Sequence, residues 1–169
     1  MILVEADVSE EWDSSTDWAQ LALAAVRAAV AQSGVPGLLD GGPAAEVSVK
    51  FTSDDEVRSL NAAWRGKDKA TNVLSFPMVA PEQVAALAAS AEGEALLGDI
   101  VLAHGICGEE AAAKGIAACT HAAHLVVHGT LHLLGLDHET DEGEAEAMEA
   151  AERRALAGLG IADPYEMHR

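Results

Sequence analysis

A short segment, residues 128–138, constrains the fold more than any other part of the chain. It holds three histidines at spacings of four and six residues, with a glycine three residues before the last one. Because residues four apart share one face of a helix, His128 and His132 can point their imidazoles at one place. Gly135 can end that helix, since glycine takes a left-handed conformation at little cost, and the chain can then return His138 to the same point. The segment predicts a helix followed by a tight reversal.

The same three histidines predict a chemistry. Three neutral imidazoles with an open fourth position are typical of catalytic zinc, whereas structural zinc sites are closed by four protein ligands. The pattern therefore indicates metal-assisted hydrolysis with His128, His132 and His138 as ligands, and a buried polar network is the alternative. His121 and His124 lie on the stripe that leads to His128. For these two histidines, packing or the orientation of a ligand is favoured over ligation.

The histidine spacing is shared with a group of zinc proteases, whose pattern is His-Glu-x-x-His-x-x-Gly-x-x-His. The residue after the first histidine, where those proteases carry the glutamate that acts as general base, is Gly129 in this chain. Without that carboxylate, peptide hydrolysis lacks its proton acceptor. A zinc protease is therefore disfavoured, and it stays as one alternative.

Three segments of the chain form a second pattern: Asn61 to Pro77, Leu97 to Ile100, and His128 to His138. They resemble, in the same order, segments of the YbeY family of bacterial endoribonucleases. Those family segments are Asn-x-x-aromatic-Arg with Thr-Asp-Val-Leu-Ser-Phe-Pro, a Gly-Asp-Ile strand, and His-Gly-x-Leu-His-Leu-x-Gly-Tyr-Asp-His. Two positions depart from the family pattern: Asn72 stands where aspartate is common, and Leu136 stands where tyrosine is common.

The resemblance implies a zinc-dependent, single-strand-specific endoribonuclease that acts in 16S rRNA 3′-end maturation and in ribosome quality control. Its implied partners are the RNA precursor and the ribosome or its small subunit. It also implies that His128, His132 and His138 bind one zinc ion, other divalent metals being possible, and that Arg65 is the catalytic arginine. A planar guanidinium suits phosphoryl oxygens. Asp137 is expected to hold the turn or orient an imidazole, as a second-shell partner like His124.

The sequence leaves two points of this reading open. The nucleophile is either a metal-activated hydroxide or the 2′-hydroxyl of the RNA itself. A non-catalytic, ribosome-associated RNA-binding protein, with zinc in a structural role, is the second alternative to a nuclease.

The charge of the chain opposes an RNA substrate. The formal net charge is −18, with only 10 Lys and Arg against 28 Asp and Glu, whereas RNA-binding surfaces cluster cations against phosphates. Much of the acidity lies in residues 137–152, where it is expected to be solvated. The cations that can still form a local patch are Arg65, Lys67, Lys69, Lys50 and Arg58. Of these, Lys67 and Lys69 are predicted to bind substrate.

The length of 169 residues suits a single domain, predicted over residues 1–169. No apolar run approaches the ~20 residues of a membrane span, and the N-terminus lacks the basic region of a secretory signal. Two cysteines, Cys107 and Cys119, provide no disulfide framework. These features predict a cytoplasmic protein without membrane association.

Hydrophobic periodicity predicts an α+β domain, in which a four-stranded mixed sheet packs with about five helices and the ligand helix lies near the centre. The expected strands cover residues 2–8, 45–51, 72–76 and 98–103. The expected helices cover residues 16–33, 53–64, 107–114, 117–134 and 141–158, and residues 79–95 are expected to be a loop with at most one helical stretch.

Four local features of this pattern can be checked individually. Ser14, Ser15 or Thr16 is predicted to cap the first helix, and Ser53 to cap the second. Trp64 is favoured as a core anchor over a base-stacking residue. The glutamate-rich face of the last helix is expected to be solvated.

Overall fold

The framework of the molecule is a four-stranded sheet. A computed structural model describes residues 1–39, 42–136 and 142–163. In spatial order the strands are β1 (Ile2–Val8), β2 (Ala44–Thr52), β4 (Glu94–Ala103) and β3 (Val73–Pro77). β1, β2 and β4 pair in parallel, whereas β3 is antiparallel to β4 and forms one edge. The predicted mixed sheet is confirmed, with β4 beginning four residues earlier than expected.

The described residues form six α-helices and one short 3₁₀ helix. They are α1 (Trp18–Gln32), η1 (Pro36–Leu38), α2 (Asp54–Arg65), α3 (Pro81–Ala88), α4 (His104–Lys114), α5 (Ala118–Leu133) and α6 (Glu142–Gly158). The prediction of about five helices is confirmed, and α3 is the one helical stretch that the sequence allowed within residues 79–95. Its start is fixed by Pro81 in the first turn and by the backbone N–H of Ala80, which donates to the Gln83 side chain at 2.8 Å.

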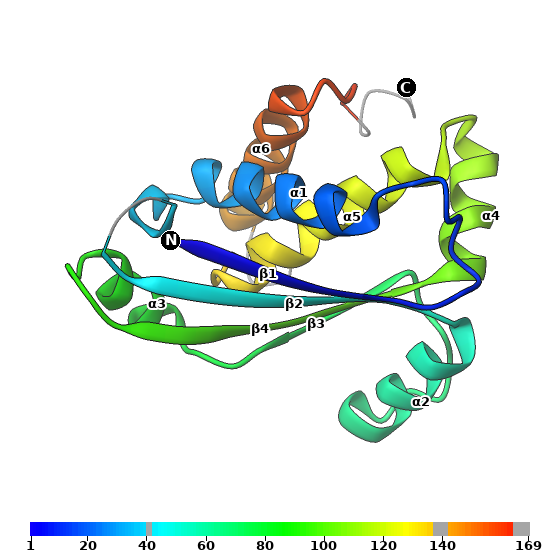
Figure 1. The fold of residues 1–169 in the computed structure, drawn as a ribbon, viewed down its shortest axis with the longest axis horizontal. Helices are drawn as coiled ribbons and strands as arrows, with labels where there is room; N and C mark the ends of the chain where they lie inside the picture. The colour runs from blue at the N-terminus through cyan, green and yellow to red at the C-terminus, as the bar shows by residue number, and fades with distance from the viewer. Residues whose placement is uncertain (40–41, 137–141, 164–169) are drawn as a thin grey trace.

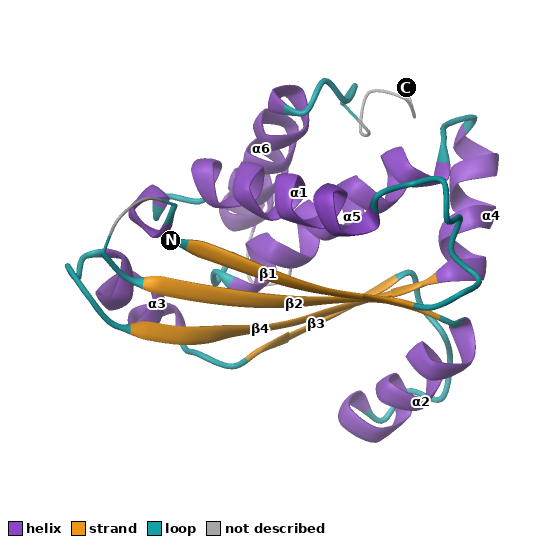
Figure 2. Cartoon of the chain, in the orientation of Figure 1, coloured by secondary structure: helices purple, strands orange, loops and turns teal. Residues whose placement is uncertain are grey.

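The helices cover the two faces of the sheet unequally. α1, α5 and α6 lie over one face and α2 lies on the other (Figure 1), and the strand colouring of Figure 2 shows how much of the second face no helix covers. Alternate residues of β2 point into the core on the first face: Ala45, Val47, Val49 and Phe51, each at most 1% exposed. On the second face, Val57 and Leu60 of α2 pack over a small cluster that includes Val101.

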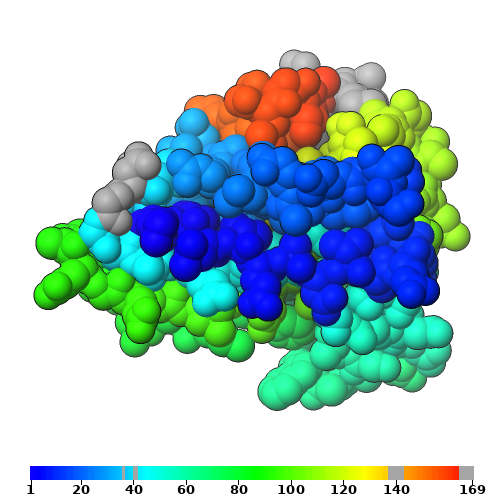
Figure 3. Space-filling view, viewed as in Figure 1, coloured from blue at the N-terminus to red at the C-terminus, as the bar shows by residue number. Residues whose placement is uncertain are grey.

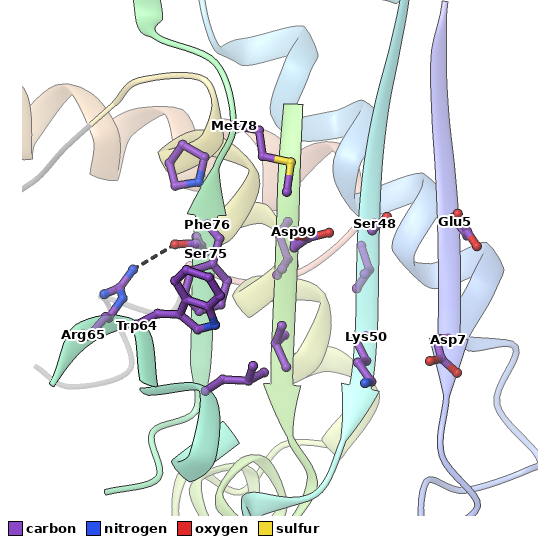
Figure 4. Close-up of a pocket in the computed structure, with 15 residues that line it drawn as sticks. Glu5, Asp7, Ser48, Lys50, Trp64, Arg65, Ser75, Phe76, Met78 and Asp99 are labelled. Atoms are coloured by element: carbon purple, nitrogen blue, oxygen red, sulfur yellow. Dashed lines mark hydrogen bonds between the residues drawn. The ribbon is translucent and has the colours of Figure 1, made fainter. Parts of the chain in front are cut away.

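A register shift in the sheet changes the direction of one side chain. Opposite Glu46 and Val47, strand β4 carries one extra residue, so Leu96 and Gly98 rather than Leu96 and Leu97 are paired with β2. Gly98 has φ +149°, and a Cβ there would lie 2.3 Å from the Phe76 carbonyl oxygen. Such bulges re-aim the side chains that follow them. Beyond the bulge, Asp99 points to the second, open face of the sheet, as Figure 4 shows.

Two predictions about helices require correction. The N-cap of α1 is Asp17, whose Oδ1 accepts from the Gln20 N–H at 3.0 Å, because residues 13–16 form their own turn around Asp13. Trp64 is 74% exposed and is not a core anchor. α2 forms a lobe on the open face of the sheet (Figure 3), and its apolar packing against that face, through Val57 and Leu60, does not include Trp64. The Ser53 cap is confirmed, since Ser53 Oγ accepts from the Glu56 N–H at 3.1 Å.

Within the described residues, no helix has both the length and the apolar character needed to cross a bilayer.

Candidate active site

Helix α5 packs closely against the sheet at Gly129. A Cβ at this position would lie 3.0 Å from both Ser75 Oγ of β3 and Ile100 Cγ2 of β4. Residue 129 therefore faces the sheet, and a glutamate side chain has no room there. Close packing of α5 against β3 therefore explains why this chain cannot carry, at position 129, the glutamate that acts as general base in the zinc proteases.

This contact makes a prediction about stability. Gly129→Ala should lower the free energy of unfolding by about 1–3 kcal/mol, because the added methyl group overpacks the interface between helix and sheet. Gly108→Ala, in α4, is the matched control, since a Cβ there meets nothing within 4 Å. That control should raise stability by about 0.5–1 kcal/mol through helix propensity. Urea unfolding measures both; an equal effect of the two substitutions would contradict the close approach.

The predicted helix end at Gly135 is confirmed. Gly135 has φ +96°, its N–H donates to the His132 carbonyl at 3.0 Å, and the Leu136 N–H donates to the Leu131 carbonyl at 3.0 Å. These two bonds form a Schellman motif, which reverses the chain after a helix. The next residues of the prediction, Asp137 and His138, lie outside the described residues.

His128 and His132 converge in one groove. Their Nε2 atoms lie 3.1 Å apart, at one end of a groove of about 630 Å³ between β3 and the end of α5, which Arg65 also lines. Two nitrogens bound tetrahedrally to zinc lie roughly 3.3 Å apart, given Zn–N distances near 2.0–2.1 Å. The pair therefore fits zinc as two of its ligands. Among the described residues, no set of three His, Cys, Asp or Glu side chains converges in this way.

A buried carboxylate contacts one member of this pair, His128. Glu152 of α6 is 1% exposed; its Oε1 lies 2.5 Å from His128 Nδ1 and its Oε2 lies 3.1 Å from His124 Nε2. A carboxylate on Nδ1 selects the tautomer that leaves Nε2 as the electron-pair donor, which is the usual support of a metal-binding histidine. His124 thus contacts the orienting carboxylate, as a second-shell residue does.

Glu152 corrects the expectation that the glutamate-rich face of the last helix is solvated. A signal for its role was present in the sequence. Glu152 lies four residues after Met148 and four before Leu156, both fully buried. A carboxylate in the middle of an apolar stripe at helical spacing needs a partner, because an unpaired buried charge is costly.

A second polar cluster lies beside the groove. His121 Nε2 is 2.8 Å from Glu110 Oε1, and the Asn72 side chain donates to the same oxygen at 3.1 Å. Asn72 Oδ1 also accepts from the Val73 N–H at 2.7 Å. An aspartate at position 72 would bring a second carboxylate against Glu110. Asn72, which stands where the family commonly has aspartate, avoids this repulsion and donates a hydrogen bond to Glu110 instead.

The same cluster makes stability depend on pH. Burial lowers the pKa of His121 below 6.5, and the charges of Lys114 and His124 lower this pKa further, whereas the hydrogen bond that the imidazole shares with the Glu110 carboxylate opposes the shift. Between the folded pKa and about 6.5 the unfolded chain binds more protons, so the free energy of unfolding should fall as pH drops through that interval. His121→Gln should flatten the fall by up to about 1.4 kcal/mol per pH unit. Urea unfolding at pH 7.5, 6.5 and 5.5 tests this, and parallel profiles for both proteins would contradict it.

Arg65 is fixed at the edge of the sheet. Its Nη2 donates to the Ser75 carbonyl at 2.8 Å, and its guanidinium carbon lies 5.7 Å from the centre of the Phe76 ring. Because β3 is an edge strand, this carbonyl is available to a side chain instead of a neighbouring strand. The contact holds the guanidinium beside the groove that contains His128 and His132.

The structure gathers fewer cations than the sequence suggested. Lys50 Nζ lies 2.5 Å from Glu56, and Arg58 Nε lies 2.8 Å from Asp68. Lys67 and Lys69 are exposed in the segment that follows α2. Among the described residues that line the histidine groove, Arg65 is the cation, and neither Lys67 nor Lys69 is included. Substrate binding by these two lysines stays a prediction.

The fold and the groove define a small α+β protein with paired imidazoles at the end of its central helix. The family model described as endoribonuclease YbeY matches residues 6–160. The chain belongs to this family, whose members are RNA-cleaving enzymes.

Similar proteins agree over nearly the whole chain. The chain is 54% identical to endoribonuclease YbeY of Rhizorhabdus wittichii over 165 residues, which cover 98% of this chain and 97% of the relative. It is 51% identical to the protein of the same name from Novosphingobium aromaticivorans, with 96% and 95% covered. The solution structure of TM1509 from Thermotoga maritima shares the fold, with a TM-score of 0.53 at 22% identity and 97% and 98% covered.

Proposed function

We propose that this chain is a zinc-dependent, single-strand-specific endoribonuclease whose ligands are His128, His132 and His138. The observation that carries the proposal is the convergence of two imidazole nitrogens at 3.1 Å in a groove that also contains an arginine. Imidazole ligands also bind other divalent metals. Family membership supports RNA as the substrate.

Each residue of the groove has a distinct role in this proposal. When bound, zinc supplies a Lewis acid and an activated water at neutral pH. Glu152 holds the His128 imidazole in the required tautomer. Arg65 gives one N–H to Ser75 and makes no other hydrogen bond to a described residue, so its remaining N–H groups can bind the phosphoryl oxygens of the RNA.

The finer assignment is that the substrate is the precursor of the 16S rRNA 3′ end, cut in the cytoplasm during ribosome maturation and quality control. Lys67 and Lys69 would contact the RNA backbone next to the groove. This assignment is supported by the resemblance of the chain to the YbeY family, and the arginine beside the paired imidazoles is compatible with a phosphodiester substrate.

The proposal is tested by adding zinc-loaded protein to a labelled precursor of the small-subunit rRNA 3′ end. Cutting by the wild type that His128→Ala abolishes would support it. A wild-type protein that binds zinc and RNA but leaves every RNA intact would favour the non-catalytic RNA-binding alternative. Cleavage of casein at a rate comparable to that of RNA cleavage would favour the zinc-protease alternative.

Arg65→Lys tests the role of the guanidinium. The substitution keeps the positive charge but loses the planar fork, so kcat/KM for RNA cleavage should fall about a hundredfold. Arg58→Lys is the matched control, because Arg58 lies on the same helix and pairs with exposed Asp68 outside the groove. If Arg65→Lys and Arg58→Lys changed kcat/KM by the same factor, Arg65 would have no specific role in RNA cleavage.

A further inference from the structure

A second groove, of about 720 Å³, lies on the open face of the sheet beside α2 (Figure 4). It is separated from the histidine groove only by the edge strand β3, and Arg65, Ser75 and Pro77 line both. A single strand of RNA whose phosphate is held at Arg65 can therefore place a neighbouring nucleotide in this second groove. The role assigned above to the arginine does not use this groove.

Aromatic side chains form one wall of the second groove. Trp64 and Phe76 both line it, Trp64 is 74% exposed, and the two rings make no ring contact with each other. Met78, 55% exposed, also lines this groove. Exposed aromatic rings beside a single-stranded nucleic acid bind bases by stacking.

Three carboxylates, those of Asp99, Glu5 and Asp7, lie on the floor of this groove, which the strands form. Asp99, which the bulge in β4 turns to this face, is half-buried and is the cross-strand neighbour of Phe76. It makes no hydrogen bond or ion pair with any described residue. Glu5 and Asp7 lie farther along the floor, and Lys50 is already paired with Glu56. The floor therefore repels phosphates and accepts hydrogen bonds from N–H donors, while Arg65 at the rim attracts the backbone.

We propose that this groove binds a guanine base of the RNA substrate, stacked on Trp64 and Phe76 with its Watson–Crick edge on Asp99. The inference rests on the proposed function, since it places a nucleotide next to the one at Arg65. Guanine presents two adjacent N–H donors, at N1 and N2, which match the two oxygens of a carboxylate. Uracil presents one such donor between two carbonyl oxygens, which a carboxylate repels.

The experiment uses full-length, zinc-loaded protein and 2′-O-methyl RNA nonamers, which retain bases and phosphates but are not cut through the 2′-hydroxyl. The probes are U₄GU₄ and U₄IU₄, because inosine lacks only the N2 amino group. Trp12 and Trp18 are 4% and 5% exposed, so quenching of solvent-exposed tryptophan emission reports on Trp64. U₄GU₄ should quench this emission and bind about tenfold more tightly than U₄IU₄.

Three variants assign the effect to the groove. Asp99→Asn should remove the preference for guanine over inosine, and Trp64→Phe should remove the quenching while keeping the preference. Trp64→Ala should weaken binding of U₄GU₄ at least about fivefold through lost stacking. Leu96→Ala is the control, because Leu96 is 40% exposed but does not line the groove, and it should change neither signal.

Equal affinity for the two probes, or RNA binding that leaves tryptophan emission unchanged, would overturn the proposal. Quenching by an oligolysine peptide in place of RNA would also overturn it, and would assign the acidic floor to a protein partner. Gel analysis after each titration checks that the nonamers stay intact, so that affinity and quenching report binding, and the preference for guanine can then hold even if the rRNA precursor is not cut. Conversely, cleavage of the rRNA precursor together with equal affinity for U₄GU₄ and U₄IU₄ would contradict the guanine subsite but would still support the proposed nuclease function.

Discussion

Replacing His132 by alanine should reduce kcat/KM for RNA cleavage at least about a thousandfold while the protein stays folded. The substitution removes one of two imidazoles that meet at 3.1 Å in the groove, and with it a proposed ligand for the metal ion. Metal ions contribute several kcal/mol to the stabilisation of transition-state charge, and each 1.36 kcal/mol corresponds to a tenfold change in rate. A side chain that lines a groove is expected to matter less for folding than for binding.

Cleavage kinetics, zinc affinity against a chromophoric chelator, and circular dichroism together distinguish the possible outcomes. His104→Ala is the control, since His104 packs against the Trp12 ring, with centroids 5.3 Å apart, and does not line the groove. That variant should retain zinc and activity. If His132→Ala lost both its fold and its zinc, the result would indicate that the metal has a structural role and not a catalytic one. If it retained activity, the ligand assignment would be wrong.

Replacing Glu152 by glutamine should weaken zinc binding about 10–100-fold and also lower the free energy of unfolding by about 1–3 kcal/mol. The carboxylate accepts from His128 and His124 at the same time. A glutamine side chain of the same size has one oxygen and one NH₂ group, so it can accept from only one of these imidazoles and presents a donor to the other. The tautomer of His128 is then no longer fixed.

Glu149→Gln is the matched control for this substitution. Glu149 lies about one turn earlier on α6, is 42% exposed, and pairs with Arg153 at 3.5 Å. Its replacement should change stability by less than about 0.5 kcal/mol and leave zinc affinity unchanged. Zinc titration and urea unfolding of both variants measure the contrast. Indistinguishable variants would mean that Glu152 does not orient the site.

The parts of the structure that could be predicted from the sequence are those with a local cause. Alternating apolar residues defined the strands, because burial on one face of a sheet has a period of two. The left-handed turn at Gly135 and the shared face of His128 and His132 follow from helix geometry alone. The family motifs added Arg65, which no periodicity singles out.

The parts that could not be predicted depend on contacts between distant segments. Glu152 reaches His128 only because α6 packs against α5, and its neighbours in sequence, such as Glu149, are solvated. The exposure of Trp64 depends on how α2 packs against the open face of the sheet. Asp99 faces the open groove because of a bulge between β2 and β4, which is a property of the pairing and not of either strand.

The bond between Arg65 and the edge of β3 has a consequence for how the protein behaves at high concentration. An edge strand offers free backbone groups on which another chain can add a strand, and such pairing leads to aggregation. Here the Ser75 carbonyl is already occupied by Arg65, and β3 ends at Pro77, which has no N–H to offer. The arginine proposed to bind substrate therefore also occupies a backbone acceptor at the β3 edge, so we expect loss of Arg65 to favour self-association through that edge as well as to lower activity.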